Sequence, residues 1–154
     1  SGLTLDMLVV PCSGGGLAAG IGVALAATMP SVAVYVAEPA GFDDYGRSLA
    51  AGEMVRNAAM GGSVCDALLA PSPGAIGFSL NRRNLRGGFA VTDEEALAAV
   101  AFAFRELKLV VEPGGAVALA ALLSGRFDAK GKTVVIVLSC GNIDPAVLER
   151  ALNA

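Results

Sequence analysis

The sequence contains no histidine. Ser–His–Asp and Cys–His nucleophilic catalysis are therefore excluded. The three cysteines, Cys12, Cys65 and Cys140, include no CxxC pair, so a zinc site is not indicated either. Free thiols of this kind are typical of proteins in a reducing compartment. We therefore expect a cytoplasmic protein.

Long apolar runs and basic runs are also missing. The longest apolar run, residues 14–27, is shorter than the roughly 18 residues of a membrane span, and Pro30 closes it. No basic residue precedes Asp6, so the start of the sequence lacks the pattern of a secretory signal. The net charge of −3, without a basic run, argues against nucleic acid binding. We expect neither a membrane nor a nucleic acid as partner.

Apolar residues and glycine are abundant instead, at about two-thirds of the 154 residues. Typical soluble domains have roughly 45–50% on this count. A parallel sheet buried on both faces explains such a composition. Membership of a larger assembly explains it equally, because apolar surface would then lie against missing partners. Both explanations are kept.

Three consecutive glycines follow the first apolar run. They belong to the stretch Pro11-Cys12-Ser13-Gly14-Gly15-Gly16-Leu17, which precedes an Ala-rich segment of helix length. Glycines let backbone N–H groups converge on one point, and a helix start adds unpaired donors and partial positive charge. The stretch predicts an anion site, most simply for a phosphate. Alternatively, the glycines only allow close helix–strand packing. The spacing matches neither the P-loop nor the dinucleotide fingerprint.

Strand and helix patterns alternate along the chain. They predict an α/β fold, an open and mostly parallel sheet with helices on both faces, as a single domain over residues 1–154. The expected strands are residues 5–10, 32–37, 88–91 and 132–138, with a brief extended piece at 109–112. The expected helices are residues 14–29, 43–51, 93–107, 113–124 and 145–152. Residues 52–88 are expected to form loops and short helices, because they are rich in Gly, Pro, Ser and Asn.

Two helix starts have specific signals. Thr92 followed by Glu95 three residues later predicts a capping box. Pro113 suits the first turn of a helix, and Gly125 lies just past its expected end.

Polar or glycine-rich residues follow three of the expected strands. They are Ser13–Gly16, then Glu38 with Asp43 and Asp44, and then Ser139–Asn142. Parallel strands end at one edge of a sheet, and ligands bind at that edge in open α/β sheets. Each group also has a simpler explanation. Glu38 could be a solvated acid, the two aspartates could cap a helix, and Ser139 could be a turn residue.

Four motifs together resemble one family. They are Pro11-Cys-Ser-Gly-Gly-Gly-Leu17, Glu38-Pro39, Val111-Glu-Pro-Gly-Gly-Ala116 and Val137-Leu-Ser-Cys-Gly-Asn-Ile-Asp144. In this order and spacing they resemble the pyridoxal-phosphate-dependent threonine/serine dehydratases and serine racemases. These enzymes have the tryptophan-synthase-like fold, fold type II. The resemblance covers the whole chain.

The resemblance implies a role for individual residues. The cofactor's 5′-phosphate would be held by Ser13, Gly14, Gly15, Gly16 and Leu17, in agreement with the anion site predicted above. Ser139 would face the pyridine nitrogen. A hydroxyl there, rather than a carboxylate, would leave that nitrogen largely unprotonated, which suits β-elimination. Glu112 matches the family's acid at the lip of the active site.

The resemblance also implies a divalent-cation site like that of the racemase-like members. Its ligands would be Glu38, the backbone carbonyl of Phe42, and Asp44. Hard oxygen ligands suit Mg²⁺, Mn²⁺ or Ca²⁺. Family members often have a small residue where Phe42 stands, a change that a carbonyl ligand tolerates.

The family's Schiff-base lysine lies in a Ser-x-Lys motif far upstream of the phosphate loop. The only lysines here, Lys108, Lys130 and Lys132, lack that context. We therefore expect the chain to be the C-terminal part of the large pyridoxal-phosphate-binding domain, with the N-terminal half absent and this chain inactive alone. The parent protein would deaminate serine- or threonine-like hydroxy amino acids to a 2-oxo acid and ammonia. We expect the chain to form a homo-oligomer or to associate with a complementary N-terminal half. The alternative is a catalytically empty phosphate- or pyridoxal-phosphate-binding regulatory module.

Overall fold

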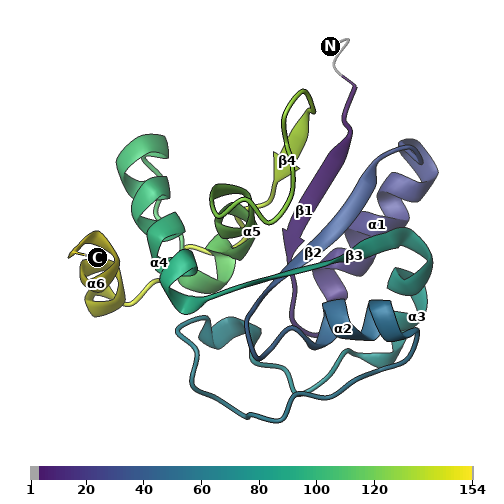
Figure 1. Ribbon diagram of the computed structural model, residues 1–154, viewed down its shortest axis with the longest axis horizontal. Helices are drawn as coiled ribbons and strands as arrows, with labels where there is room; N and C mark the ends of the chain where they lie inside the picture. The colour runs from purple at the N-terminus through teal and green to yellow at the C-terminus, as the bar shows by residue number, and fades with distance from the viewer. Residues whose placement is uncertain (1–3, 154) are drawn as a thin grey trace.

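A computed structural model of the chain describes residues 4–153 and shows an α/β fold (Figure 1). Its single sheet has four parallel strands in the order β3-β2-β1-β4. The strands are β1 (Met7–Pro11), β2 (Ala33–Pro39), β3 (Leu85–Val91) and β4 (Val134–Ile136). The predicted parallel α/β fold is thus confirmed.

Six α-helices surround the sheet. They are α1 (Gly16–Thr28), α2 (Asp44–Ala51), α3 (Ala75–Asn84), α4 (Asp93–Phe102), α5 (Pro113–Leu123) and α6 (Pro145–Asn153). A short 3₁₀ turn, η1 (Asp66–Leu68), lies in the long loop before α3, and a π-helical turn, η2 (Ala103–Leu107), extends α4. Figure 1 shows α1, α2 and α3 toward one side of the molecule and α4, α5 and α6 toward the other.

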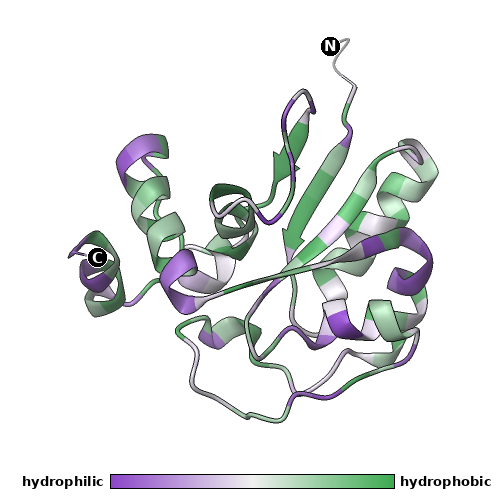
Figure 2. Cartoon of the chain, in the orientation of Figure 1, coloured by the Kyte–Doolittle hydropathy of each residue, from purple (hydrophilic) through white to green (hydrophobic). Residues whose placement is uncertain are grey.

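The central strand β1 is buried on both faces, as the composition predicts. Leu8 and Val10 belong to a core cluster with Phe78 of α3, whereas Val9 belongs to a second cluster with Val117 of α5. Side chains alternate between the faces of a strand, so neighbouring residues enter opposite cores. Figure 2 shows the resulting apolar colour along β1 and α5.

The predicted helix starts are confirmed. The Thr92 hydroxyl accepts a hydrogen bond from the Glu95 N–H at 3.2 Å, and the Glu95 carboxylate accepts one from the Thr92 N–H at 2.8 Å. This reciprocal pair satisfies two N–H groups at the start of α4. Pro113 occupies the first turn of α5, where a missing N–H has no cost.

Two sequence predictions of secondary structure are wrong. The strand expected over 132–138 shrinks to β4, and Val135 is 41% exposed because β1 alone pairs with β4 among the described residues. Residues 52–88 contain the helices η1 and α3, as expected, but their last four residues form the first half of β3, which was not predicted. The glycines of β3 hide its strand pattern, and pairing with β2 supplies the stability that its sequence lacks.

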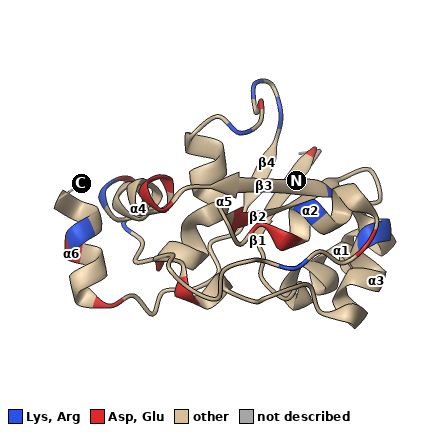
Figure 3. Cartoon of the chain, turned by 60° about the horizontal axis from the view of Figure 1, so that its bottom comes forward, with Lys and Arg blue, Asp and Glu red and all other residues tan. Residues whose placement is uncertain are grey.

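Within residues 4–153, no helix has both the length and the apolar content required to cross a bilayer. Figure 3 shows the lysines and arginines distributed over several elements, among them α2, α3, α6 and the loop before β4.

Candidate functional site

The glycine loop and Ser139 meet at the carboxyl edge of the sheet. The loop follows β1 and Ser139 follows β4, and these two strands are paired neighbours. Their ends line one cavity of about 320 Å³. Its lining residues are Pro11, Cys12, Ser13, Gly14, Gly15, Gly16, Leu17, Ala18, Ala67, Leu68, Ser139 and Cys140. The structure therefore places two motifs more than a hundred residues apart at one site.

The loop has the geometry of a helix start with free donors. Helix α1 begins at Gly16, and the capping residue Gly15 has a left-handed conformation with φ +88°. Among the described residues, no acceptor pairs with the N–H groups from Ser13 to Leu17. These amides add to the partial positive charge of the helix end. The loop is therefore suited to a phosphate.

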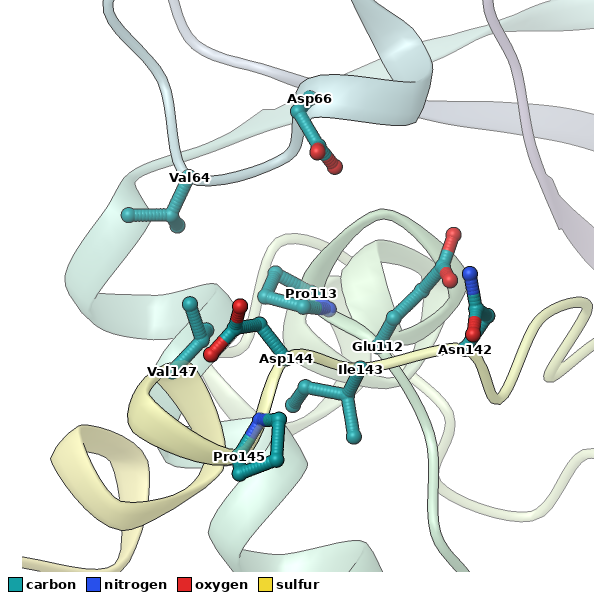
Figure 4. A pocket seen from close by; sticks show the side chains of 9 residues that line it. All are labelled: Val64, Asp66, Glu112, Pro113, Asn142, Ile143, Asp144, Pro145 and Val147. Carbon is teal, nitrogen blue, oxygen red and sulfur yellow. The ribbon is translucent and has the colours of Figure 1, made fainter.

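Glu112 lines a second cavity, of about 400 Å³ (Figure 4). Asp66 and Asn142 also line it, whereas Ala67, the residue after Asp66, and Cys140, two residues before Asn142, line the loop cavity. In Figure 4 the side chains of Glu112 and Asn142 lie at one end of this cavity. Glu112 does not line the loop cavity itself, and its role as an active-site acid stays a prediction.

Glu38 and Asp44 meet at the start of α2, away from the lining of both cavities. Glu38 is fully buried, and its two carboxylate oxygens accept hydrogen bonds from the N–H groups of Tyr45 at 3.0 Å and Gly46 at 2.8 Å. Burial raises the pKa of Glu38 to about 8, although these two hydrogen bonds oppose the shift. Burial likewise raises the pKa of Asp44.

The two carboxylate oxygens of Asp44 differ in their hydrogen bonding, which bears on whether a cation fits here. Its Oδ1 atom accepts a hydrogen bond from Asn57, whereas its Oδ2 atom is buried without a partner among the described residues. A buried, unpaired carboxylate oxygen is a reasonable cation ligand. However, residues 4–153 contain no group of three or more His, Cys, Asp or Glu side chains arranged to hold a metal. Two carboxylates and the Phe42 carbonyl would therefore need water ligands as well.

The three lysines lie elsewhere. Lys108 donates to the carbonyl of Arg105, and Lys132 donates to that of Asp128 at 2.9 Å. These two lysines and Lys130 are exposed, and none of the three lines the loop cavity.

Comparison with known proteins agrees with this geometry. The family described as "Pyridoxal-phosphate dependent enzyme" matches residues 2–140. The chain belongs to this family. The family resemblance drawn from the four motifs is thereby confirmed.

Three relatives illustrate the range of this similarity. Phenylserine dehydratase of Ralstonia pickettii is 38% identical over 150 residues, which are 97% of this chain and 46% of that protein. Serine racemase of Dictyostelium discoideum is 34% identical over 152 residues, covering 97% and 47%. L-threonine ammonia-lyase of Thermotoga maritima is 34% identical over 149 residues, covering 97% and 37%. The chain thus spans about half the length of the curated relatives it matches.

Solved structures share the fold. Serine racemase from Dictyostelium discoideum superposes with a TM-score of 0.82 at 35% identity, over 91% of this chain and 45% of that one. Maize serine racemase superposes with a TM-score of 0.85 at 32% identity, over 97% and 48%. A threonine deaminase structure superposes with a TM-score of 0.86 at 36% identity, over 93% and 51%. The chain therefore has the fold of the pyridoxal-phosphate enzymes of fold type II.

Two buried residues beside the loop were missed by sequence reasoning. Tyr45 of α2 and Asn81 of α3 are both fully buried. Each contacts Gly15 of the loop, and neither lines the loop cavity. Asn81 lies in the stretch expected to form loops and short helices, so no helical pattern pointed to it. Tyr45 directly follows Asp44, which the family resemblance marks as a cation ligand.

Proposed function

We propose that the protein is a pyridoxal-phosphate-dependent lyase that deaminates serine- or threonine-like hydroxy amino acids to a 2-oxo acid and ammonia. The observation that carries this proposal is the single cavity shared by the glycine loop and Ser139. Two of the relatives described above, a phenylserine dehydratase and an L-threonine ammonia-lyase, support the reaction class.

Each part of the cavity would have a distinct task. The N–H groups from Ser13 to Leu17 would bind the 5′-phosphate, because they are unpaired and lie at a helix start. The Ser139 hydroxyl would hydrogen-bond the ring nitrogen and leave it largely unprotonated. Bound pyridoxal phosphate would supply the electron withdrawal that acidifies the substrate Cα–H. Glu112, in the second cavity, would face the substrate at the lip of the site.

The amine that binds the cofactor would come from outside these 154 residues. Support comes from the three lysines, which lie away from the loop cavity, and from the relatives, whose length is about twice that of the match. We therefore propose that residues 1–154 form the C-terminal part of the large domain. A complementary N-terminal half would complete it. Alternatively, two copies of the chain would associate through the apolar edge strand β4.

Racemisation of serine is the second candidate function. Serine racemases of several organisms are among the relatives, at 34–39% identity for those of Dictyostelium discoideum and Mus musculus. Both reactions start with removal of the same Cα proton, so the cavity suits either. The product distinguishes them, because only the lyase forms a 2-oxo acid and ammonia.

A weak divalent-cation site at Glu38, the Phe42 carbonyl and Asp44 is a further part of this proposal. The unpaired Asp44 Oδ2 supports it. Calorimetric titration with Mg²⁺ should give binding heat for the wild-type chain and none for Asp44→Asn. Asp128→Asn, at an exposed position, serves as control. Equal heats for wild type and Asp44→Asn would contradict the site.

The main proposal is tested with the complete protein that carries this chain. Loaded with pyridoxal phosphate, it should convert L-serine or L-threonine to a 2-oxo acid and ammonia in equal amounts. Ser139→Ala should reduce turnover while phosphate anchoring at the loop stays intact. Ser124→Ala is a matched control, because the Ser124 hydroxyl donates to the carbonyl of Ala120 and Ser124 does not line the loop cavity. If the protein formed the opposite serine enantiomer and no 2-oxo acid, it would be a racemase and not a lyase. If Ser139→Ala had the turnover of the wild type, Ser139 would have no role in the reaction and would be only a turn residue.

A further inference from the structure

We propose that Asn81 and Tyr45 are positioning residues that aim the N–H groups of the glycine loop at the phosphate. This inference rests on the proposed function and adds two residues to it. Neither residue lines the loop cavity, so both would act through the backbone of Gly15.

The far side of the loop is held by helix α3. The carbonyl of Gly14 accepts a hydrogen bond from the Gly74 N–H at 3.0 Å, and the carbonyl of Gly15 accepts one from the Asn81 Nδ2–H at 3.1 Å. A trans peptide unit is planar, so its N–H points opposite to its C=O. Holding these two carbonyls on α3 therefore directs the N–H groups of Gly15 and Gly16 away from α3. No residue of α3 lines the loop cavity.

Asn81 is oriented by two acceptors. Its Nδ2 atom also donates to the Tyr45 hydroxyl at 2.6 Å. The Gly15 carbonyl can only accept, so the side-chain amide must present its nitrogen to the loop. The Gly15 carbonyl also accepts the Ala19 N–H of α1 at 2.9 Å, so the pair adds a second donor that holds the Gly15–Gly16 peptide unit in this direction.

The ring of Tyr45 fixes the same glycine from another direction. A Cβ atom built on Gly15 would lie 2.2 to 2.4 Å from ring and hydroxyl atoms of Tyr45. The ring therefore rests directly on the glycine backbone, which has a left-handed conformation that other residues rarely adopt. The Tyr45 ring and the Asn81 amide both contact Gly15, so together they restrict the backbone conformation of this glycine.

A purely structural role explains Asn81 less well. Its Oδ1 atom is buried without a hydrogen-bond partner among the described residues. An unpaired buried amide oxygen is costly, and an apolar side chain of similar size would avoid that cost. What an apolar side chain could not provide is the donor to Gly15. The observation therefore favours a role for the Nδ2–H groups themselves.

The test is a titration of the ¹⁵N-labelled 154-residue chain with inorganic phosphate, followed through the amide resonances of Gly15 and Gly16. The wild-type chain should bind, with shifts at both amides. Asn81→Leu should weaken phosphate affinity about tenfold, the effect of one lost hydrogen bond, and reduce the Gly16 shift. Ser79→Ala is the matched control, because Ser79 lies on the same helix and bonds only to the carbonyl of Ile76. It should bind phosphate like the wild type.

Tyr45→Phe covers the case in which Asn81→Leu does not fold, since it keeps the ring and removes only the hydroxyl. It should move the Gly16 resonance in the phosphate-free chain and weaken phosphate binding about threefold. Wild-type binding together with unchanged affinity and unchanged Gly16 shifts in the folded variants would overturn this inference and leave the proposed function standing. Failure of the wild type to bind phosphate at the loop would overturn both.

Discussion

The backbone of Cys140 lies directly on Gly115. A Cβ atom added to Gly115 would stand 2.8 Å from both the backbone nitrogen and the carbonyl oxygen of Cys140. The N–H of Glu112, just before α5, donates to the same carbonyl at 3.0 Å. The start of α5 is therefore the platform on which the segment carrying Ser139 rests.

This contact predicts opposite effects for two glycine substitutions in helices. Gly115→Ala should destabilise the chain by about 1–3 kcal/mol, because the new methyl group has no space. Gly20→Ala, in α1, should stabilise it by about 0.5–1 kcal/mol, since nothing lies within 4 Å of the new Cβ and alanine is the better helix former. Urea unfolding of both variants measures the difference. Stabilisation by both substitutions would contradict the close contact.

Glu38 predicts a stability that falls with rising pH. Burial raises its pKa from 4.5 to about 8 in the folded chain, so the folded state holds a proton that the unfolded state has released. Its contribution is complete below about pH 4.5 and is lost as the pH rises to about 8. Each pKa unit is worth about 1.4 kcal/mol, so the loss is at most several kcal/mol.

The measurement is urea unfolding between pH 4.5 and 8, the interval between the two pKa values, in the presence of a chelator. Glu38→Gln, which has no titrating group, should give a flatter dependence than the wild type. Glu149→Gln, an exposed acid of α6, should leave the slope unchanged. An equal dependence of stability on pH in the wild type and Glu38→Gln would contradict a raised pKa of Glu38 in the folded chain.

The three cysteines should differ in reactivity. Cys140 is exposed, whereas Cys12 and Cys65 are buried. Burial raises the pKa of the Cys65 thiol to about 12 and that of Cys12 further still, so neither forms the reactive thiolate near neutral pH. Alkylation with iodoacetamide, read by mass spectrometry, should modify Cys140 first and the other two only with unfolding. Equal rates for all three in the folded chain would contradict their burial.

The capping box predicts a moderate loss of stability for Thr92→Ala. Removing the hydroxyl leaves the Glu95 N–H at the start of α4 without its partner, which costs about 1 kcal/mol. Thr28→Ala is the comparison, because its hydroxyl is exposed and bonds to the carbonyl of Ala24 inside α1. Its effect on thermal unfolding should be clearly smaller. Similar losses for both would show that the capping box adds nothing.

Local patterns in the sequence determined much of this protein. The apolar run before the glycines predicts β1, Thr92 and Glu95 predict the start of α4, and Pro113 predicts the start of α5. These signals depend on neighbours within a few residues, so they can be read without the fold. The motifs that mark the family are also contiguous, and they placed the candidate phosphate loop and Ser139.

Only the tertiary structure decided how these pieces meet. Pairing of β4 with β1 brings Ser139 to the glycine loop. The sequence of β4 predicts a fully buried strand, but its position at the edge of the sheet leaves it partly exposed. The contacts of Asn81 and Tyr45 with Gly15 join three separate elements. No local pattern encodes them, because hydrogen bonds and ring contacts across elements depend on the packing of helices on the sheet. The sequence thus determined which residues could bind a phosphate, and the packing decided what holds them in place.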